Sequence, residues 1–290
     1  MHKLLDKISY NPHKDIFVHV GDIFAKGPHK ESLAVLSYMA KHNITGVRGN
    51  HDQKVIEWRG WMDWVRSLPG GKIWLQALDS RSANIANEEE GEELAERELD
   101  VMHMNWRKRI PKGWKLFSDH YRLARDMNKK EYEYLISLPL VLHIPTAHTF
   151  IVHAGLLPSD PSRDPYYHRQ PLSHMPILSS SSNSSEDQLR LVQELSLLTQ
   201  IPQNTDPWNK LNIRSITKSR QVTKSAKDGT PWSELWNDVM GQCVGYDDGK
   251  GKKGKLACKP SMVVYGHAAS RGLDIKRWSI GTDSGCVSAS

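Results

Sequence analysis

Short apolar runs that end in glycine alternate along this chain with stretches of helical periodicity. The run DIFVHVGD (15–22) predicts a buried strand that ends at Gly21-Asp22, and ITGVRGNHD (44–52) predicts a second strand that stops at Gly49. Between them, apolar residues from Glu31 to His42 recur at helical spacing. A strand, a helix and a strand within about thirty residues form a βαβ unit, which favours a parallel sheet.

Three later apolar runs predict the other strands of an α/β fold. They are TFIVHAG (149–155), MVVYGH (262–267) and WSIGTDSGCV (278–287). The intervals between the strands are long and differ from them in composition. We predict a helical insertion at about 54–139 and a variable, loop-rich insertion at about 157–261, both within a single domain that spans 1–290.

A helix is also expected inside the second insertion, after the serine run at 179–185. Its apolar residues recur at helical spacing and are expected to share one face of that helix: Leu189, Val192, Leu195 and Leu198.

Composition narrows the class of protein. The 290 residues are 38% hydrophobic and 25% charged, which is typical of a globular chain. No stretch approaches the roughly 18 apolar residues of a membrane helix, and the first residues lack the apolar core of a signal peptide, so the chain alone predicts a cytoplasmic protein without a membrane segment. The net charge of +6 makes a polyanion a plausible ligand.

The cysteines do not indicate a metal site or a fold stabilised by several disulfides. Cys243, Cys258 and Cys286 are too few and too scattered for a disulfide framework or a CxxC zinc site.

Polar side chains follow four of the predicted strands. Asp22, Asn50-His51, His153 and His267 each come directly after an apolar run. Ligands of open α/β sheets bind outside the carboxyl ends of the strands, where these side chains are expected to lie. Carboxylate, amide and imidazole groups are suitable ligands for Zn²⁺, Mn²⁺ or Fe²⁺. The pattern therefore predicts a divalent metal centre, and two ions together would clamp a phosphoryl group.

The motifs occur in a fixed order: GDxxxKGP at 21–28, GNHD at 49–52, HAGLLP at 153–158 and GH at 266–267. This order resembles the calcineurin-like metallophosphoesterase superfamily, in its phosphoprotein-phosphatase-like branch. The KGP and GNHD variants resemble the ApaH-like phosphatases, and especially the fungal members that act as polyphosphatases. The resemblance implies a four-layer α/β/β/α sandwich with a dinuclear metal centre.

The resemblance also implies roles for single residues. Asp22 would bridge two metal ions, and Asn50, His153 and His267 would complete the shell of the second ion. His51 would be the general acid. The neighbouring carboxylate of Asp52 would orient it, because a carboxylate beside an imidazole fixes its tautomer.

Other residues would contact the substrate. Lys26 stands where related phosphatases carry a phosphate-binding arginine, and it supplies a point charge without a bidentate fork. Arg214 is the candidate for a second phosphate clamp, with a role as an ordinary surface arginine as the alternative. Asp283 resembles a family residue whose side chain contacts the metal ligands rather than the metal itself.

One family motif is missing from the sequence. GDxHG, whose Asp and His hold the first metal in the family, does not occur, and the chain stops soon after GTDSGCV. The first strand and the last strands of the sandwich are therefore expected to be absent. Either the sequence is a truncated gene model or the protein has lost its first metal. In both cases the first-metal site is incomplete, and we expect this chain to be poorly active.

The leading function is metal-dependent hydrolysis of phosphoric anhydrides or esters, most closely that of an endopolyphosphatase. The alternatives are a protein serine/threonine phosphatase and a dinucleoside polyphosphate or RNA cap hydrolase. A catalytically impaired phosphate-binding protein is the alternative of another class. No nucleic-acid-binding pattern occurs, and the sequence does not predict an oligomeric state. Resemblance to the fungal enzymes implies a vacuolar location.

Overall fold

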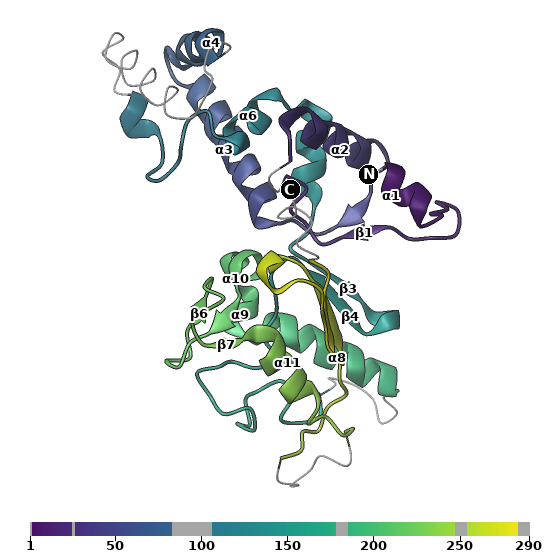
Figure 1. The fold of residues 1–290 in the computed structure, drawn as a ribbon. Coiled ribbons are helices and arrows are strands. Elements are labelled where there is room, and N and C mark those ends of the chain that lie inside the picture. Colours follow the sequence, from purple (N-terminus) through teal and green to yellow (C-terminus); the bar gives the residue numbers. More distant parts are fainter. Residues whose placement is uncertain (1, 25–26, 83–105, 178–184, 247–253, 284–290) are drawn as a thin grey trace. The chain divides into compact units, whose positions relative to one another are not determined.

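The computed structural model describes residues 2–24, 27–82, 106–177, 185–246 and 254–283 (Figure 1). The chain forms two units, and each is built from three separate stretches of sequence. The first comprises Met1–Leu5, Ile23–Asn43 and His51–Ser137, and the second comprises Asp6–Asp22, Ile44–Asn50 and Leu138–Ser290. The prediction of a single domain over 1–290 stays a prediction.

The first unit is helical. Its described elements are α2 (His29–Lys41), α3 (Asn50–Ser67, whose first residue belongs to the second unit), α4 (Gly71–Ser82), η1 (Trp106–Arg109), α6 (Asp119–Asp126) and α7 (Lys129–Ser137); α1 (His2–Lys7) precedes them at the boundary. Aromatic side chains fill its interior, where Trp58 packs against Trp61, Trp114 and Tyr121. The helix predicted from Glu31 to His42 is confirmed as α2.

The second unit contains the sheets. β1 (Val18–His19) and β2 (Thr45–Gly46) pair in parallel, as the βαβ pattern predicts. The five-stranded sheet has the order β3-β4-β8-β10-β9, and its strands are β3 (Val141–Ile144), β4 (Thr149–Val152), β8 (Met262–Tyr265), β9 (Asp274–Ile275) and β10 (Ser279–Gly281). The three-stranded sheet has β5 (Ser215–Ile216) between β6 (Val222–Thr223) and β7 (Thr230–Pro231). The predicted α/β class is confirmed.

The ends of the central strands are brought to one edge by their pairing. β4 and β10 both run parallel to β8, so the carboxyl ends of these three strands lie side by side. The segments that follow them carry His153, His267 and Asp283. β1 is shorter than the predicted strand, because only Val18 and His19 pair with β2, and Asp22 follows three residues after His19.

Helices share the core of the central sheet. Phe150, Val152 and Val263 from the sheet lie in one buried cluster with Leu197 of α8 (Glu186–Thr199) and Trp236 of α11 (Trp232–Met240). Short helices precede β5: α9 (Pro202–Thr205) and α10 (Pro207–Asn212), while η2 (Pro145–Ala147) and η3 (Ala269–Arg271) form tight turns.

The helix expected after the serine run is α8, and its buried face carries polar as well as apolar side chains. Leu195 is 44% exposed, whereas the side chains of Gln193, Glu194 and Leu197 are buried. Glu194 can be buried because polar partners surround it: His143 Nε2 lies 2.7 Å and His148 Nδ1 3.1 Å from its oxygens, and the Ser261 hydroxyl donates to it at 3.1 Å. A carboxylate with hydrogen-bond partners therefore lies among the buried side chains of α8.

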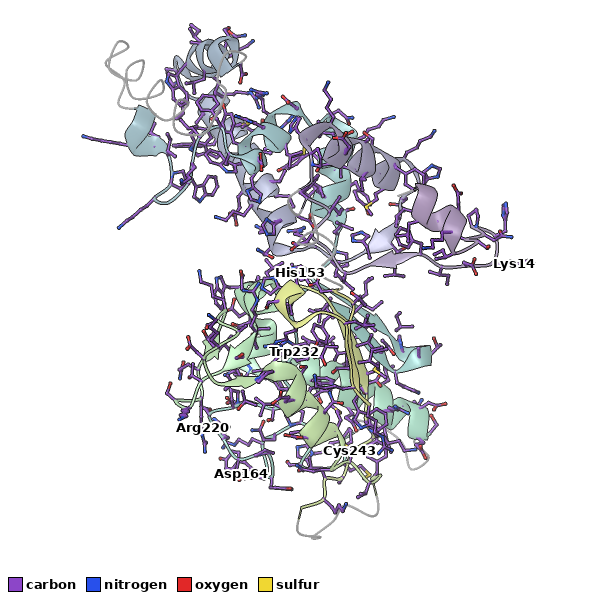
Figure 2. The ribbon with its side chains drawn as sticks, viewed as in Figure 1. Lys14, His153, Asp164, Arg220, Trp232 and Cys243 are labelled. Carbon is purple, nitrogen blue, oxygen red and sulfur yellow. A yellow bond between two sulfur atoms is a disulfide. The ribbon has the colours of Figure 1, made fainter. Side chains whose placement is uncertain are left out.

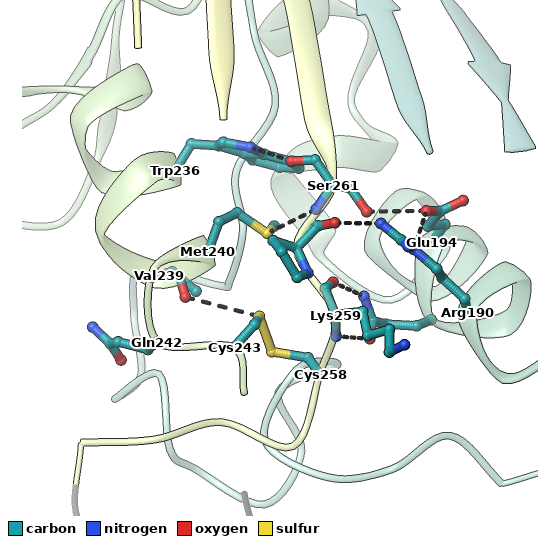
Figure 3. Close-up of a disulfide and its surroundings, with 12 residues drawn as sticks. Arg190, Glu194, Trp236, Val239, Met240, Gln242, Cys243, Cys258, Lys259 and Ser261 are labelled. Atoms are coloured by element: carbon teal, nitrogen blue, oxygen red, sulfur yellow. Dashed lines mark hydrogen bonds and ion pairs between the residues drawn. A yellow bond between two sulfur atoms is a disulfide. The ribbon is translucent and has the colours of Figure 1, made fainter. Parts of the chain in front are cut away.

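A disulfide that the sequence did not predict joins two of the cysteines. Cys243 and Cys258 are bonded, with Cα atoms 4.8 Å apart, and they join the end of α11 to the segment that leads into β8 (Figure 3). Cys258 is fully buried. Two of three cysteines that are scattered in the sequence thus meet in the fold, and Cys286 lies outside the described residues.

Candidate metal centre

His153 is the residue around which the candidate site is built. It follows β4 and is 1% exposed. Its Nδ1 lies 2.8 Å from the carbonyl oxygen of Val20, just after β1. A carbonyl oxygen only accepts hydrogen bonds, so Nδ1 carries the proton and the lone pair of a neutral His153 is on Nε2. This backbone contact fixes the tautomer in the way that partners of metal-binding histidines do.

Three more ligand atoms converge on Nε2 of His153. Asn50 Oδ1 lies at 3.0 Å, His267 Nδ1 at 3.1 Å and Asp22 Oδ1 at 3.4 Å. The amide oxygen and the carboxylate are acceptors, so they face the lone pair of His153 rather than a donor. A cation placed among these atoms satisfies all the lone pairs together. The oxygen and nitrogen donors therefore fit a divalent ion of the borderline type.

Among the described residues, Asp22, His153 and His267 are the one group of three acidic, histidine or cysteine side chains that could hold a metal ion. The sequence predicted these three together with Asn50, and the structure brings all four into contact. Asp22 and Asn50 follow β1 and β2 of the two-stranded sheet, and His153 and His267 follow the neighbouring strands β4 and β8 of the five-stranded sheet. Figure 2 labels His153 at one end of its unit and Cys243 toward the opposite end.

Two of the four residues have an unusual backbone conformation. Asp22 has φ of +57° and His267 has φ of +66°, in the left-handed region that costs energy for residues other than glycine. Gly49 lies directly against Asp22, because a Cβ on Gly49 would stand 2.2 Å from Asp22 Oδ1 and 2.3 Å from Asp22 N. A glycine is therefore required at 49 for the Asp22 carboxylate to reach the site.

Arg214 lies beside the cluster. Its Nε and Nη2 donate to the carbonyl oxygen of His267 at 3.3 and 3.0 Å, and its Nη1 donates to that of Lys224 at 3.2 Å. Burial and the neighbouring Arg271 lower the pKa of Arg214, while Asp22 and Asp283 act in the opposite sense. The guanidinium thus holds the backbone of His267 in place and leaves its remaining N–H groups for another acceptor.

Asp283 is placed by the end of β10. Thr282, the residue before it, donates its backbone N–H to the carbonyl oxygen of Tyr265 at 2.8 Å. A Cβ on Gly266 would stand 3.9 Å from Asp283 Oδ2, so the carboxylate lies near the residue that precedes His267. Its predicted role behind the ligands stays a prediction. Lys26 lies outside the described residues.

His51 and Asp52 open α3 in the first unit. Asp52 is fully buried, and its Oδ1 accepts a hydrogen bond from the backbone N–H of Ile23 at 2.9 Å. His51 Nδ1 lies 2.8 Å from Nε2 of His120, a residue of α6 that the sequence did not single out. His120 is 69 residues from His51 in the sequence and lies in the region that was predicted only to be a helical insertion, where no motif occurs. The predicted orientation of His51 by Asp52 stays a prediction.

No helix among the described residues is long and apolar enough to cross a membrane.

A family model matches more than half of the chain. A model described as calcineurin-like phosphoesterase matches residues 1–195. Serine/threonine-protein phosphatase 1 of Salmonella typhimurium (strain LT2) is 32% identical over 81 residues, which are 28% of this chain and 37% of that protein. The symmetrical bis(5'-nucleosyl)-tetraphosphatase of Haemophilus ducreyi is 54% identical over 56 residues, which are 19% of this chain and 20% of that protein.

A solved structure, described as that of a proposed diadenosine tetraphosphatase, is 21% identical with a TM-score of 0.48, and it covers 99% of this chain and 78% of that chain. The chain spans well under half the length of the two named relatives that it matches in sequence.

Proposed function

Because the chain belongs to the calcineurin-like phosphoesterase family, we propose that it is a metal-dependent hydrolase of phosphoric anhydrides or esters. The resemblance drawn from GDxxxKGP and GNHD is confirmed at the level of the family. The observation that carries the proposal is the convergence of acceptor atoms on Nε2 of His153, which suits a cation. A bound divalent ion supplies positive charge that polarises a phosphoryl group and makes water a better nucleophile.

Different residues of the chain bind the ion, bind phosphate and donate the proton. Asp22, Asn50, His153 and His267 hold the ion, and Arg214 keeps the backbone of His267 in place while it offers N–H donors to phosphate oxygens. His51, next to Asn50 in the chain, gives its Nε2 proton to the leaving oxygen. We propose Mn²⁺, Zn²⁺ or Fe as the ion. A second ion of the dinuclear centre would share Asp22.

Inorganic polyphosphate is the substrate that we favour. Four exposed cations follow Arg214 in the loops between the strands of the three-stranded sheet: Lys218, Arg220, Lys224 and Lys227. Several exposed cations on the unit that carries the metal centre attract an extended polyanion more strongly than a single phosphate group. A dinucleoside polyphosphate is the second candidate, supported by the relative from Haemophilus ducreyi, and a phosphoprotein is the third, supported by the relative from Salmonella.

The disulfide bears on the compartment. Disulfides persist in oxidising compartments and are rare in the cytosol, so the Cys243–Cys258 bond supports the vacuolar location implied by resemblance over the cytoplasmic one. Trapping of free thiols in intact cells, followed by fractionation, tests this proposal. A reduced pair in a cytosolic fraction would contradict it.

The decisive experiment measures hydrolysis of polyphosphate, diadenosine tetraphosphate and a phosphopeptide while Mn²⁺, Zn²⁺ or Mg²⁺ is titrated. The chain is compared with Asn50→Ala and with Asn11→Ala, a matched control whose side chain accepts only a local backbone hydrogen bond among the contacts described for it. We expect turnover to need the metal and to be lost in Asn50→Ala alone. A version that carries an upstream GDxHG segment, where the gene encodes one, should be faster because it completes the first-metal site.

Two results would redirect the proposal. Retention of phosphate by the chain without any cleavage, with or without the upstream segment, supports the binding-protein alternative. Equal metal affinity in Asn50→Ala and in the unchanged chain contradicts the ligand set.

A further inference from the structure

His51 contacts another histidine of the helical unit, His120. His51 Nδ1 and His120 Nε2 are 2.8 Å apart, and the two imidazole rings are stacked with centroids 5.1 Å apart and planes inclined by 15°. Both side chains are half-buried. Two nitrogen atoms at this distance share one hydrogen, so one ring donates and the other accepts.

The direction of the hydrogen bond follows from the role of His51. A histidine that gives up its Nε2 proton stays neutral only if Nδ1 keeps its own proton. That Nδ1–H needs an acceptor, and Nε2 of a neutral His120 is one at the right distance. With this contact in place, the Nε2–H of His51 points to the side of the ring opposite His120.

His120 stands on a fixed support. α6 begins at the N-cap Ser118, whose side chain accepts from the backbone N–H of Tyr121. Tyr121 is fully buried, and Leu123 and Ala124 are buried on the same helix. A side chain on an anchored helix loses little freedom when it forms one more hydrogen bond, which is what a positioning residue requires.

We propose that His120 is a positioning residue that holds the tautomer and the ring plane of His51 for protonation of the leaving group. The proposal rests on the proposed function, since it assigns a partner to the general acid of that reaction. His120 touches neither the substrate nor the metal in this role and acts through His51 alone.

The test compares substrates that need an acid to different degrees. p-Nitrophenolate leaves readily without a proton, whereas phenolate from phenyl phosphate is a poorer leaving group and depends on general acid catalysis. His120→Phe keeps a flat ring and removes the acceptor, His120→Gln restores a carbonyl acceptor, and His42→Phe is a matched control. His42 is an exposed histidine of the same unit that contacts the ring of Tyr38.

We expect kcat of His120→Phe to fall about tenfold to a hundredfold for phenyl phosphate and less than about threefold for p-nitrophenyl phosphate, with KM unchanged, because general acid catalysis contributes about 10²- to 10⁴-fold. His120→Gln should recover most of the loss, and His42→Phe should match the unchanged chain. In the protein labelled with ¹⁵N-histidine, a scalar coupling between the two ring nitrogens should report the hydrogen bond directly.

An equal loss for both esters would assign His120 to the stability of the fold and overturn the proposal, as would an absent nitrogen–nitrogen coupling. If the unchanged chain binds metal but hydrolyses neither these esters nor polyphosphate or diadenosine tetraphosphate, the proposed function fails, and the assignment of His120 fails with it. The two failures are distinguishable, because only the first leaves the unchanged chain active.

Discussion

Removal of the Cys243–Cys258 bond should destabilise the sheet-containing unit without affecting the metal centre. The two cysteines are 15 residues apart in sequence. A cross-link over such a loop lowers the conformational entropy of the unfolded chain and thereby raises the free energy of unfolding by about 3 kcal/mol. With an unfolding entropy of about 2.1 cal/mol/K per residue, the 290-residue chain has about 600 cal/mol/K, so this change lowers Tm by about 5 °C.

The variant is Cys243→Ala/Cys258→Ala, and thermal unfolding is followed by circular dichroism in the absence of reductant. Cys286→Ala is the matched control, since it removes a cysteine outside the bond. Metal affinity, measured by calorimetry, should stay within about twofold of that of the unchanged chain, because the disulfide and His153 lie at opposite ends of their unit (Figure 2). Thiol titration of the denatured, oxidised chain should detect one free cysteine of the three.

A Tm within about 1 °C of that of the unchanged chain would refute the loop-entropy reasoning, provided that thiol titration shows the bond to be present. Three reactive thiols in the oxidised chain would refute the disulfide itself. Loss of metal affinity in the double variant would show that strand β8 transmits the change to His267, which we do not expect.

Three further predictions concern single residues. Gly49→Ala should weaken metal binding at least about tenfold by calorimetry, because its Cβ would displace Asp22 Oδ1 and N; unchanged affinity would exclude Asp22 as a ligand. Burial lowers the pKa of His19 to about 4, so between about pH 6.5 and pH 4 only the unfolded chain binds a proton at this residue. The contribution of His19 to the free energy of unfolding is therefore full above about pH 6.5 and is lost as the pH falls toward 4. Urea titrations at each pH should show a smaller loss of stability in His19→Gln than in the unchanged chain. Glu194→Gln should cost about 3 kcal/mol or more in urea unfolding, since it removes a buried charge from its partners; a change under about 1 kcal/mol would show that the charge is dispensable.

The motif-bearing strand ends could be predicted because their signal is local. An apolar run followed by Gly-Asp or Gly-Asn predicts a strand and a polar terminus, and the parallel pairing of β4, β8 and β10 then places those termini together. The four candidate ligands were therefore identified from the sequence, by their place after the apolar runs and by the family resemblance. Their left-handed backbone at Asp22 and His267 was not, because φ depends on how the turn meets its neighbours.

Other features depend on contacts between distant segments. Glu194 lies in the core because His143 of β3 and His148 of the turn after β3 contact its carboxylate. The spacing of apolar residues in α8 does not predict these contacts. His120 meets His51 across 69 residues, in a region whose helices have no motif. The disulfide was missed for the same reason, because spacing alone does not say whether two cysteines meet.

The interleaving of the two units limits how the protein can be divided. The continuous segment from Leu138 to the end contains most of the second unit and retains His153 and His267. Asp22 and Asn50 are the last residues of the two short stretches that the unit takes from earlier in the chain. A fragment that starts at residue 138 therefore keeps only half of the donor set, and adding residues 6–50 as a separate peptide should restore it by complementation.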